Sequence, residues 1–234
     1  MPLSLRLTAV ALATAAAVCA AALPAHAAAP ADCGADSYSY AGVVSTTTAF
    51  GVGARLSATR QPTVAKGHVA GWVGVGGAGL GANSTDAWLQ VGMSSTQSGM
   101  TALYYEVARP NTPPRYVMLK GHVPVGQVFN VAVLEAHAHP GSWRVWVNGT
   151  AMTDRIDLPG SHAAWRPTVT AESWSGDRVG ACNGYAFRFR HVRVATKPGG
   201  GWQPLADAQV ISDPGYHVRR VAGSLFAAGG FTPN

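Results

Sequence analysis

The sequence predicts an all-β protein, built as a sandwich or a barrel, and three observations support this. Short stretches with apolar residues at every second position recur along the chain, turn signals separate them, and no helical apolar stripe stands out. The composition agrees, because 28 glycines and 15 prolines occur among many Val, Thr, Trp and Tyr residues. We therefore expect one domain of antiparallel strands.

The first 27 residues predict a secretory signal peptide. Met1–Arg6 carry one positive charge, Leu7–Leu23 form an alanine-rich apolar run, and Ala25-His26-Ala27 has the Ala-x-Ala cleavage pattern. No later stretch is long and apolar enough to span a bilayer. We expect a secreted protein that is cleaved near Ala27 and then has no membrane attachment. The alanine-rich leader is typical of bacteria.

The alternation of apolar and polar residues between turn signals predicts ten strands. The predicted strands, in chain order, are Tyr38–Val44, Gly51–Leu56, His68–Val75, Ala87–Met93, Thr101–Ala108, Tyr116–Leu119, Val128–Ala136, Trp143–Val147, Thr168–Ser173 and Tyr185–Val194. Asn148-Gly149 is a type I′ hairpin signal, which pairs Trp143–Val147 with a short strand near Ala151–Arg155. The alternation slips near Arg190-His191, which predicts a β-bulge.

The end of the chain differs from the predicted domain. Residues 28–195 predict the β-domain, whereas 196–234 hold little apolar mass and predict a C-terminal extension, either an edge strand or a loosely docked tail. Within it, Thr196–Gly201 is glycine-rich and indicates a linker.

Signal cleavage removes Cys19 and leaves Cys33 and Cys182, and two cysteines in an exported protein favour a disulfide over two free thiols.

The charge pattern argues against a nucleic-acid partner. The net charge is +6, but no basic run exceeds two residues. The mild cluster of Arg188, Arg190, Arg193 and Lys197 has the spacing of an outward strand face rather than of a basic stripe interleaved with aromatics. We expect no nucleic-acid site and a monomer.

Strand parity places aromatic, amide and acidic side chains on one face of a sheet. In Ala87–Met93, Leu89 and Met93 point toward the core, so Trp88 and Gln90 point away from it. The same argument on three more strands gives a set of seven non-core residues: Trp72, Trp88, Gln90, Tyr104, Glu106, Glu172 and Trp174. Exposed indoles beside carboxylates and an amide are typical of a concave ligand groove rather than a plain solvent face.

Several of these residues lie in motifs that resemble the eqolisin family, the glutamic peptidases. The similar segments, in the same order and at similar spacing, are Gly71–Gly77, Trp88–Gly92, Tyr104–Pro110, Val123–Leu134 and Ala171–Trp174. The resemblance implies a concanavalin A-like β-sandwich, a jelly roll of two large antiparallel sheets packed face to face.

The resemblance also implies residue roles. Glu172 would be the general base that activates water, and Gln90 would hydrogen-bond that water and stabilise the oxyanion. Trp72, Trp88, Tyr104, Glu106 and Trp174 would line the substrate groove of an acid endopeptidase that acts on polypeptides without a metal or cofactor. One difference concerns Ser173, which separates Glu172 from Trp174, whereas the family has tryptophan directly after its glutamate.

Two other functions use the same face. The segment Trp143–Gly149 resembles the hairpin of laminin-G and concanavalin-type sandwiches, and stacked indoles suit sugar rings, so a non-catalytic lectin-like module that binds carbohydrate or peptide is an alternative. A glycosidase is a third, because Glu106 and Glu172 could form a carboxylate pair.

Other signals predict no site. The glycine pattern Gly74–Gly79 fits a dinucleotide motif, but no helix is predicted after it. The pair His137 and His139 has no acid or cysteine cluster in the nearby sequence and predicts an ordinary loop rather than a metal site. Glu135 follows a predicted strand, and we expect it at the rim of the sandwich.

Overall fold

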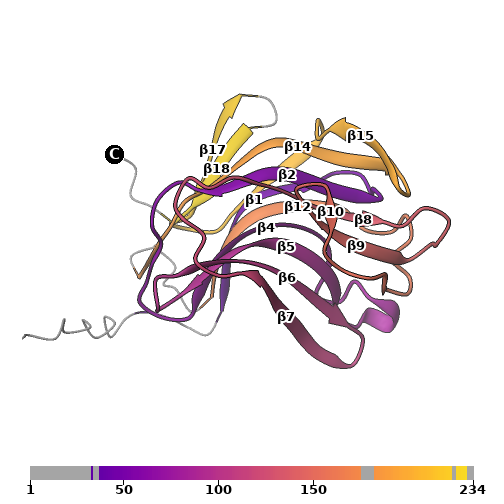
Figure 1. Ribbon diagram of the computed structural model, residues 1–234, viewed down its shortest axis with the longest axis horizontal. Helices are drawn as coiled ribbons and strands as arrows, with labels where there is room; N and C mark the ends of the chain where they lie inside the picture. The colour runs from indigo at the N-terminus through magenta and orange to yellow at the C-terminus, as the bar shows by residue number, and fades with distance from the viewer. Residues whose placement is uncertain (1–32, 34–36, 175–181, 223–224, 231–234) are drawn as a thin grey trace, which may run out of the picture.

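The computed structural model describes residue 33 and residues 37–174, 182–222 and 225–230 (Figure 1). The predicted signal peptide, 1–27, lies outside this part of the chain. The described residues form an all-β molecule of two large sheets, as the sequence predicts. Their helical structure is one short 3₁₀ turn at Ala82–Ser84.

The first sheet has seven strands, and every pair of neighbours is antiparallel. Its order is β16 (Ala208–Ser212), β1 (Tyr38–Ser45), β12 (Thr168–Trp174), β4 (His68–Gly77), β5 (Ala87–Thr96), β6 (Thr101–Arg109) and β7 (Thr112–Lys120). Figure 1 shows β12 through β7 side by side and strongly curved.

The second sheet has nine strands, seven of them on one path. These are β10 (Thr150–Ala151), β9 (Ser142–Val147), β8 (Phe129–Glu135), β2 (Gly51–Ala58), β14 (Phe187–Lys197), β18 (Leu225–Gly229) and β17 (His217–Ala222). Off this path, β11 (Ile156–Asp157) pairs with β9, and β15 (Gly200–Pro204) pairs with β14. A separate small sheet joins β3 (Thr63–Val64) to β13 (Asn183–Gly184).

The core lies between the two sheets and follows the predicted parity. Alternate residues of both sheets point inward, and burying them removes apolar surface from water, the main force that holds the layers together. The inward residues include Val73, Leu89, Val91, Met93, Tyr105 and Val169 from the first sheet and Val52, Leu56, Val133, Trp143, Phe187 and Phe189 from the second. Because these positions are fixed, the intervening residues must face outward.

Two local predictions are confirmed. The β2–β14 register shifts between Arg190 and Arg193, and His191 adopts a left-handed φ of 51°, which is the predicted bulge. The β9–β10 hairpin turns through Asn148 and Gly149, both at positive φ, as a type I′ turn requires.

One strand is longer than predicted. Tyr116–Leu119 extends to Thr112–Lys120, although the added part contains Pro113 and Pro114. The prolines are tolerated because β7 is the edge strand of the first sheet, where one row of N–H groups needs no partner.

The linker predicted at Thr196–Gly201 is wrong. This segment contains the end of β14, the tight turn of the β14–β15 hairpin and the start of β15, with φ of 78° and 72° at Gly199 and Gly201. The glycines serve a tight reversal, because they adopt left-handed backbone conformations without steric cost. Strands of the tail then join both sheets, because β16 pairs with β1 and β18 pairs with β14.

The expected rim position of Glu135 is also wrong. Its side chain is fully buried at the end of β8, where one carboxylate oxygen accepts hydrogen bonds from the Gly141 amide and, at 2.9 Å, from His162 Nδ1. Glu135 has inward parity, so it enters the molecule with Val131 and Val133. Its two partners satisfy Oε1, whereas Oε2 is buried without a hydrogen-bond partner among the described residues.

Cys33 and Cys182 form the predicted disulfide. Their Cα atoms lie 5.6 Å apart, and the two cysteines are 149 positions apart in the sequence. The bond joins the segment before β1 to the residue before β13.

Candidate active site

A hollow of about 270 Å³ lies on the outer face of the first sheet. Five neighbouring strands supply its side chains, namely β1, β12, β4, β5 and β6. The lining residues with polar or aromatic side chains are Tyr38, Tyr40, Trp72, Asp86, Trp88, Gln90, Glu106 and Glu172. Segments that are far apart in the sequence therefore meet at one concave site.

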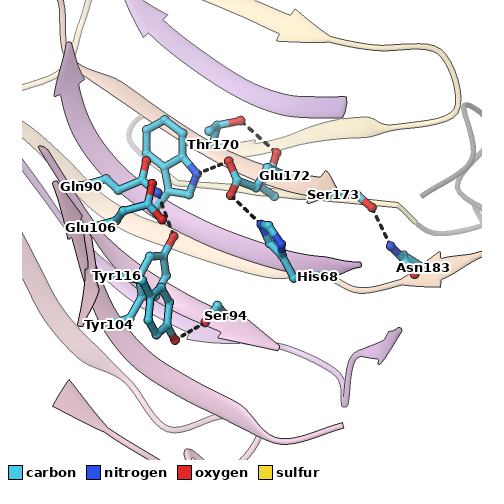
Figure 2. Close-up of polar contacts among 12 residues, drawn as sticks. His68, Gln90, Ser94, Tyr104, Glu106, Tyr116, Thr170, Glu172, Ser173 and Asn183 are labelled. Atoms are coloured by element: carbon cyan, nitrogen blue, oxygen red, sulfur yellow. Dashed lines mark hydrogen bonds and ion pairs between the residues drawn. The ribbon is translucent and has the colours of Figure 1, made fainter. Parts of the chain in front are cut away.

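Glu172 projects into this hollow from β12 and is held by two neighbours (Figure 2). Its side chain is 7% exposed, and the Trp72 indole donates a 2.8 Å hydrogen bond from Nε1 to Oε2. His68 Nε2 lies 3.6 Å from the other oxygen, Oε1. A carboxylate can accept about four hydrogen bonds, so this one keeps acceptor capacity for a water or substrate.

Gln90 lies on β5, and its amide is positioned by a tyrosine. Gln90 Nε2 donates a 3.1 Å hydrogen bond to the hydroxyl of Tyr104, which is itself stacked on Tyr116 with ring centroids 4.8 Å apart. Ser94 hydrogen-bonds the Tyr116 hydroxyl at 2.8 Å, which fixes the stack from its other end. The second N–H of the Gln90 amide has no hydrogen-bond partner among the described residues.

A second carboxylate, Glu106, lies directly opposite Gln90 on the neighbouring strand. Trp88 Nε1 donates a 3.0 Å hydrogen bond to its Oε1. Burial raises the pKa of Glu106 above its ordinary value of 4.5, and the negative charge of Glu172 raises it further, against the opposing effects of Trp88 and His68. Glu106 therefore retains its proton to a higher pH than a solvated glutamate.

The register places Trp72 between Glu172 and Gln90. Glu172 pairs with Ala70 of β4, whereas Gln90 of β5 pairs with Gly74, four positions further along β4. Trp72 is the midpoint of that diagonal and points to the same face. A ligand that lies on the Trp72 indole therefore reaches the acid on one side and the amide on the other.

The tyrosines at the other end of the hollow remain protonated. Burial, together with the charges of Glu172 and Glu106, raises the pKa of Tyr38 from 10.0 to about 12. The same causes, with further charges nearby, raise the pKa of Tyr40 well above its usual range. Both phenols are hydrogen-bond donors at every physiological pH.

Two residues predicted for the groove floor lie outside the hollow. Tyr104 is 2% exposed because Tyr116 covers it, so it acts on the hollow through Gln90. Trp174 packs on Tyr38, with ring centroids 4.5 Å apart, and supports the wall without lining it. The side chains of Trp72, Trp88, Gln90, Glu106 and Glu172 do line the hollow together.

Sequence reasoning missed three residues of the site. Tyr38 and Tyr40 have the parity opposite to the core residue Ala41, and His68 has the parity of Trp72. The same alternation argument could have found all three, had it been applied to the first strand and to the start of the third.

In the part of the chain that the structure describes, no group of three or more His, Cys, Asp or Glu side chains is arranged to hold a metal ion. The described residues also include no helix long and apolar enough to cross a membrane.

The fold matches that of the glutamic peptidases. The structure is similar to scytalido-glutamic peptidase with a peptide-based transition-state analogue, at a TM-score of 0.56 and 15% identity over 84% of this chain and 98% of that one. It is also similar to SCP-B, a member of the eqolisin family in a complex with the tripeptide Ala-Ile-His, at a TM-score of 0.52 and 16% identity over 84% and 98%. The resemblance predicted from the motifs is therefore confirmed at the level of the fold.

Neither a family model nor a curated protein sequence matches the chain.

Proposed function

We propose that this protein is an acid endopeptidase in which Glu172 activates the attacking water and Gln90 stabilises the oxyanion. One observation carries the proposal: on a fold shared with glutamic peptidases, this acid and this amide line the same aromatic hollow. A fold alone does not define a function, so the argument rests on what these side chains can do.

Glu172 suits the role of general base. Trp72 and His68 hold the carboxylate from two directions, while its remaining acceptor sites face the hollow. General acid–base catalysis by carboxyl groups is most efficient in acidic medium, because the best catalytic pKa lies near the working pH and the reference pKa of a glutamate is about 4.3. The expected activity is therefore acidic.

Gln90 suits the role of oxyanion donor. An amide N–H polarises a carbonyl at any pH because it does not ionise. Tyr104 holds one N–H of the Gln90 amide, which orients the other toward the hollow as a preorganised donor. Preorganisation matters because a donor that is already aimed costs no reorganisation when the negative charge develops.

Glu106 suits the role of proton donor to the leaving amine. The two glutamates have different environments, because Glu106 has a raised pKa whereas Glu172 is held by an indole N–H and a histidine. Pairs of acids that differ in this way often divide acid and base roles. In this mechanism Glu172 accepts the proton of water, the carbonyl oxygen becomes an oxyanion beside Gln90, and Glu106 delivers a proton to the departing nitrogen.

Substitution of the two central residues tests the proposal. With a mixture of quenched fluorescent peptides between pH 3 and 6, Glu172→Gln should lose at least about 10³-fold in kcat/KM and Gln90→Ala about 10²-fold, the usual cost of losing one oxyanion donor. Melting temperatures of both variants show whether they remain folded. Wild-type protein without acid peptidase activity, or activity that survives Glu172→Gln, would reject the mechanism.

Non-catalytic peptide or glycan binding in the same hollow is a second candidate, and the register favours it. Trp72 separates Glu172 from Gln90, so no described hydrogen bond joins the two, and an indole flanked by an acid and an amide is also a ligand platform. A glycan array and a peptide array on the wild-type protein separate the candidates, because a binding module retains its ligand intact.

We also propose that the protein acts outside the cytoplasm. The Cys33–Cys182 disulfide is typical of an oxidising compartment, which agrees with the predicted signal peptide. Secretion with cleavage near Ala27 would be checked by the N-terminal residue of protein recovered from culture medium.

A further inference from the structure

A second and larger hollow, of about 520 Å³, lies on the opposite outer face of the molecule, over the second sheet. Its volume is within the range of sites that hold small ligands. A row of cross-strand neighbours forms its floor, and this row runs Trp146, Ala132, Gly53 and Arg193 across β9, β8, β2 and β14. Small residues at the centre and large ones at both ends leave a trough, whose span is about 14 Å at three strand spacings.

Two indoles flank this trough. Trp146 stands at its β9 end, and Trp202 of β15 stands at the other end beside Arg193, whose guanidinium lies 5.6 Å from the centre of the Trp202 ring. The cation–π contact holds the indole and the guanidinium in a fixed relation. Flat apolar faces with a cation beside them suit ring-shaped ligands that carry negative charge.

The positive charge of the trough has no counterpart within the described chain. Arg55 lies in the lining and is paired across the sheet with another arginine, Arg190, an arrangement that destabilises a sheet by like-charge repulsion. No carboxylate lines the hollow. Both ion pairs between described residues join a histidine to a glutamate, so neither neutralises these arginines. An anionic ligand would supply the missing charge.

An unpartnered donor lies in the trough. Trp146 Nε1 is a buried atom without a hydrogen-bond partner, and so is Arg144 Nε, two positions earlier on the same face of β9, which lines an adjoining hollow that shares Trp146 with the trough. Buried donors in folded proteins are nearly always satisfied, so the free Trp146 N–H indicates an acceptor from outside the chain. The amide of Asn130 adds a further polar group to the lining.

We propose that this trough binds an acidic oligosaccharide, a chain of sugar rings that carry carboxylates. Apolar ring faces would stack on Trp146 and Trp202, and carboxylates would pair with Arg55 and Arg193, because guanidinium groups bind carboxylates through two parallel hydrogen bonds. A nucleic acid fits less well, because its backbone is bound by a long basic stripe, whereas these arginines gather in one short trough. The site is independent of the Glu172 hollow, which lies on the other sheet.

Binding to oligogalacturonate tests the proposal by titration calorimetry at low salt. Fully methyl-esterified oligogalacturonate is the matched neutral probe, because it has the same ring chain without charge. We expect binding to the acid form that weakens with salt, at least tenfold weaker binding to the ester, and at least tenfold loss of affinity in Trp146→Ala and in Arg55→Ala/Arg193→Ala. Arg166→Ala removes an exposed arginine elsewhere and should leave the affinity unchanged.

Three results would overturn the inference. Wild-type protein without affinity for the acid form excludes the ligand class. Equal loss of affinity in Arg166→Ala and the trough variants indicates diffuse attraction by net charge. Tighter binding of an oligothymidylate of equal charge, lost in the same trough variants, assigns the trough to nucleic acid. Melting temperatures of the variants confirm that each remains folded, and the exposed position of Arg55 makes Arg55→Glu a second probe that leaves the sheet intact.

Discussion

Glu106 and Glu172 show how one sheet face gives two identical side chains different properties. Burial raises the pKa of Glu106, and the charge of Glu172 adds to the shift, against the opposing effect of the Trp88 hydrogen bond. Glu172 instead accepts the Trp72 hydrogen bond and lies beside His68. Environment, rather than residue type, therefore suggests which glutamate donates a proton and which accepts one.

The pH dependence of cleavage tests this division. If Glu106 must be protonated, kcat/KM should fall as the pH rises through its pKa, which lies above 4.5 in the folded protein. Glu106→Gln keeps the shape of the side chain but cannot deliver a proton, so its kcat should fall about 10²-fold and the alkaline limb of the profile should flatten. An unchanged alkaline limb in this variant would assign that limb to another group. Profiles of kcat and kcat/KM from pH 2.5 to 7 provide the measurement.

At the scale of residues, the sequence predicts the direction in which a side chain points, because alternation along the strand determines it. Gln90 and Glu172 follow from the parity of their strands, because period-2 geometry leaves only two directions for a side chain. The burial of Tyr104 could not be predicted from alternation, because it depends on Tyr116 from a neighbouring strand. The pKa of Glu106 likewise depends on neighbours that only the folded sheet supplies.

At the scale of the strands, two side chains of the candidate site, Trp72 and Gln90, face a glycine on the neighbouring strand. Trp72 pairs with Gly92, and Gln90 pairs with Gly74. A Cβ added at Gly92 would lie 2.6 Å from the Trp72 Cβ, and one added at Gly74 would lie 2.9 Å from the Gln90 Cβ. The glycines leave the space over which the indole and the amide extend.

Gly92→Ala therefore tests how the sheet positions the site. The added methyl group would lie 2.2 Å from the Gly71 carbonyl oxygen, so it must displace the β4 backbone together with Trp72. We expect a loss of about 1–3 kcal/mol in the free energy of unfolding, typical of overpacking, and at least tenfold lower activity. Gly121→Ala is the matched control, because its Cβ would meet only Met118 Sδ at 3.6 Å. Urea unfolding and peptide cleavage of both variants provide the comparison. Equal effects at the two positions would contradict a positioning role for Gly92.

The strands also show where sequence patterns fail. The glycines of Thr196–Gly201 indicate a linker and a hairpin turn equally well, because both need the same backbone freedom. The decision depends on whether the following residues find a partner strand. Trp202 pairs opposite Ala195, a contact with β14 that alternation within the tail does not reveal.

At the scale of the whole molecule, the sandwich presents two curved faces with different chemistry. The first sheet carries acids, an amide and aromatic rings, whereas the second carries arginines and two indoles. The all-β class and most strands were predictable, because they depend on local periodicity. The strand order was not, since β12 lies between β1 and β4 only through contacts about a hundred residues apart in sequence. The second hollow was missed for the same reason.

Removal of the disulfide tests how far the stability of the fold depends on a covalent bond between distant parts of the chain. Cys33 and Cys182 close a loop of 149 residues, and in the chain-entropy treatment such a loop stabilises the folded state by about 5 kcal/mol through the unfolded chain. We expect Cys33→Ala/Cys182→Ala, measured by urea unfolding, to lose a few kcal/mol with an unchanged far-UV spectrum. Dithiothreitol should destabilise the wild type and leave the double variant unaffected. A double variant as stable as the oxidised wild type would show that sheet packing alone sets the stability.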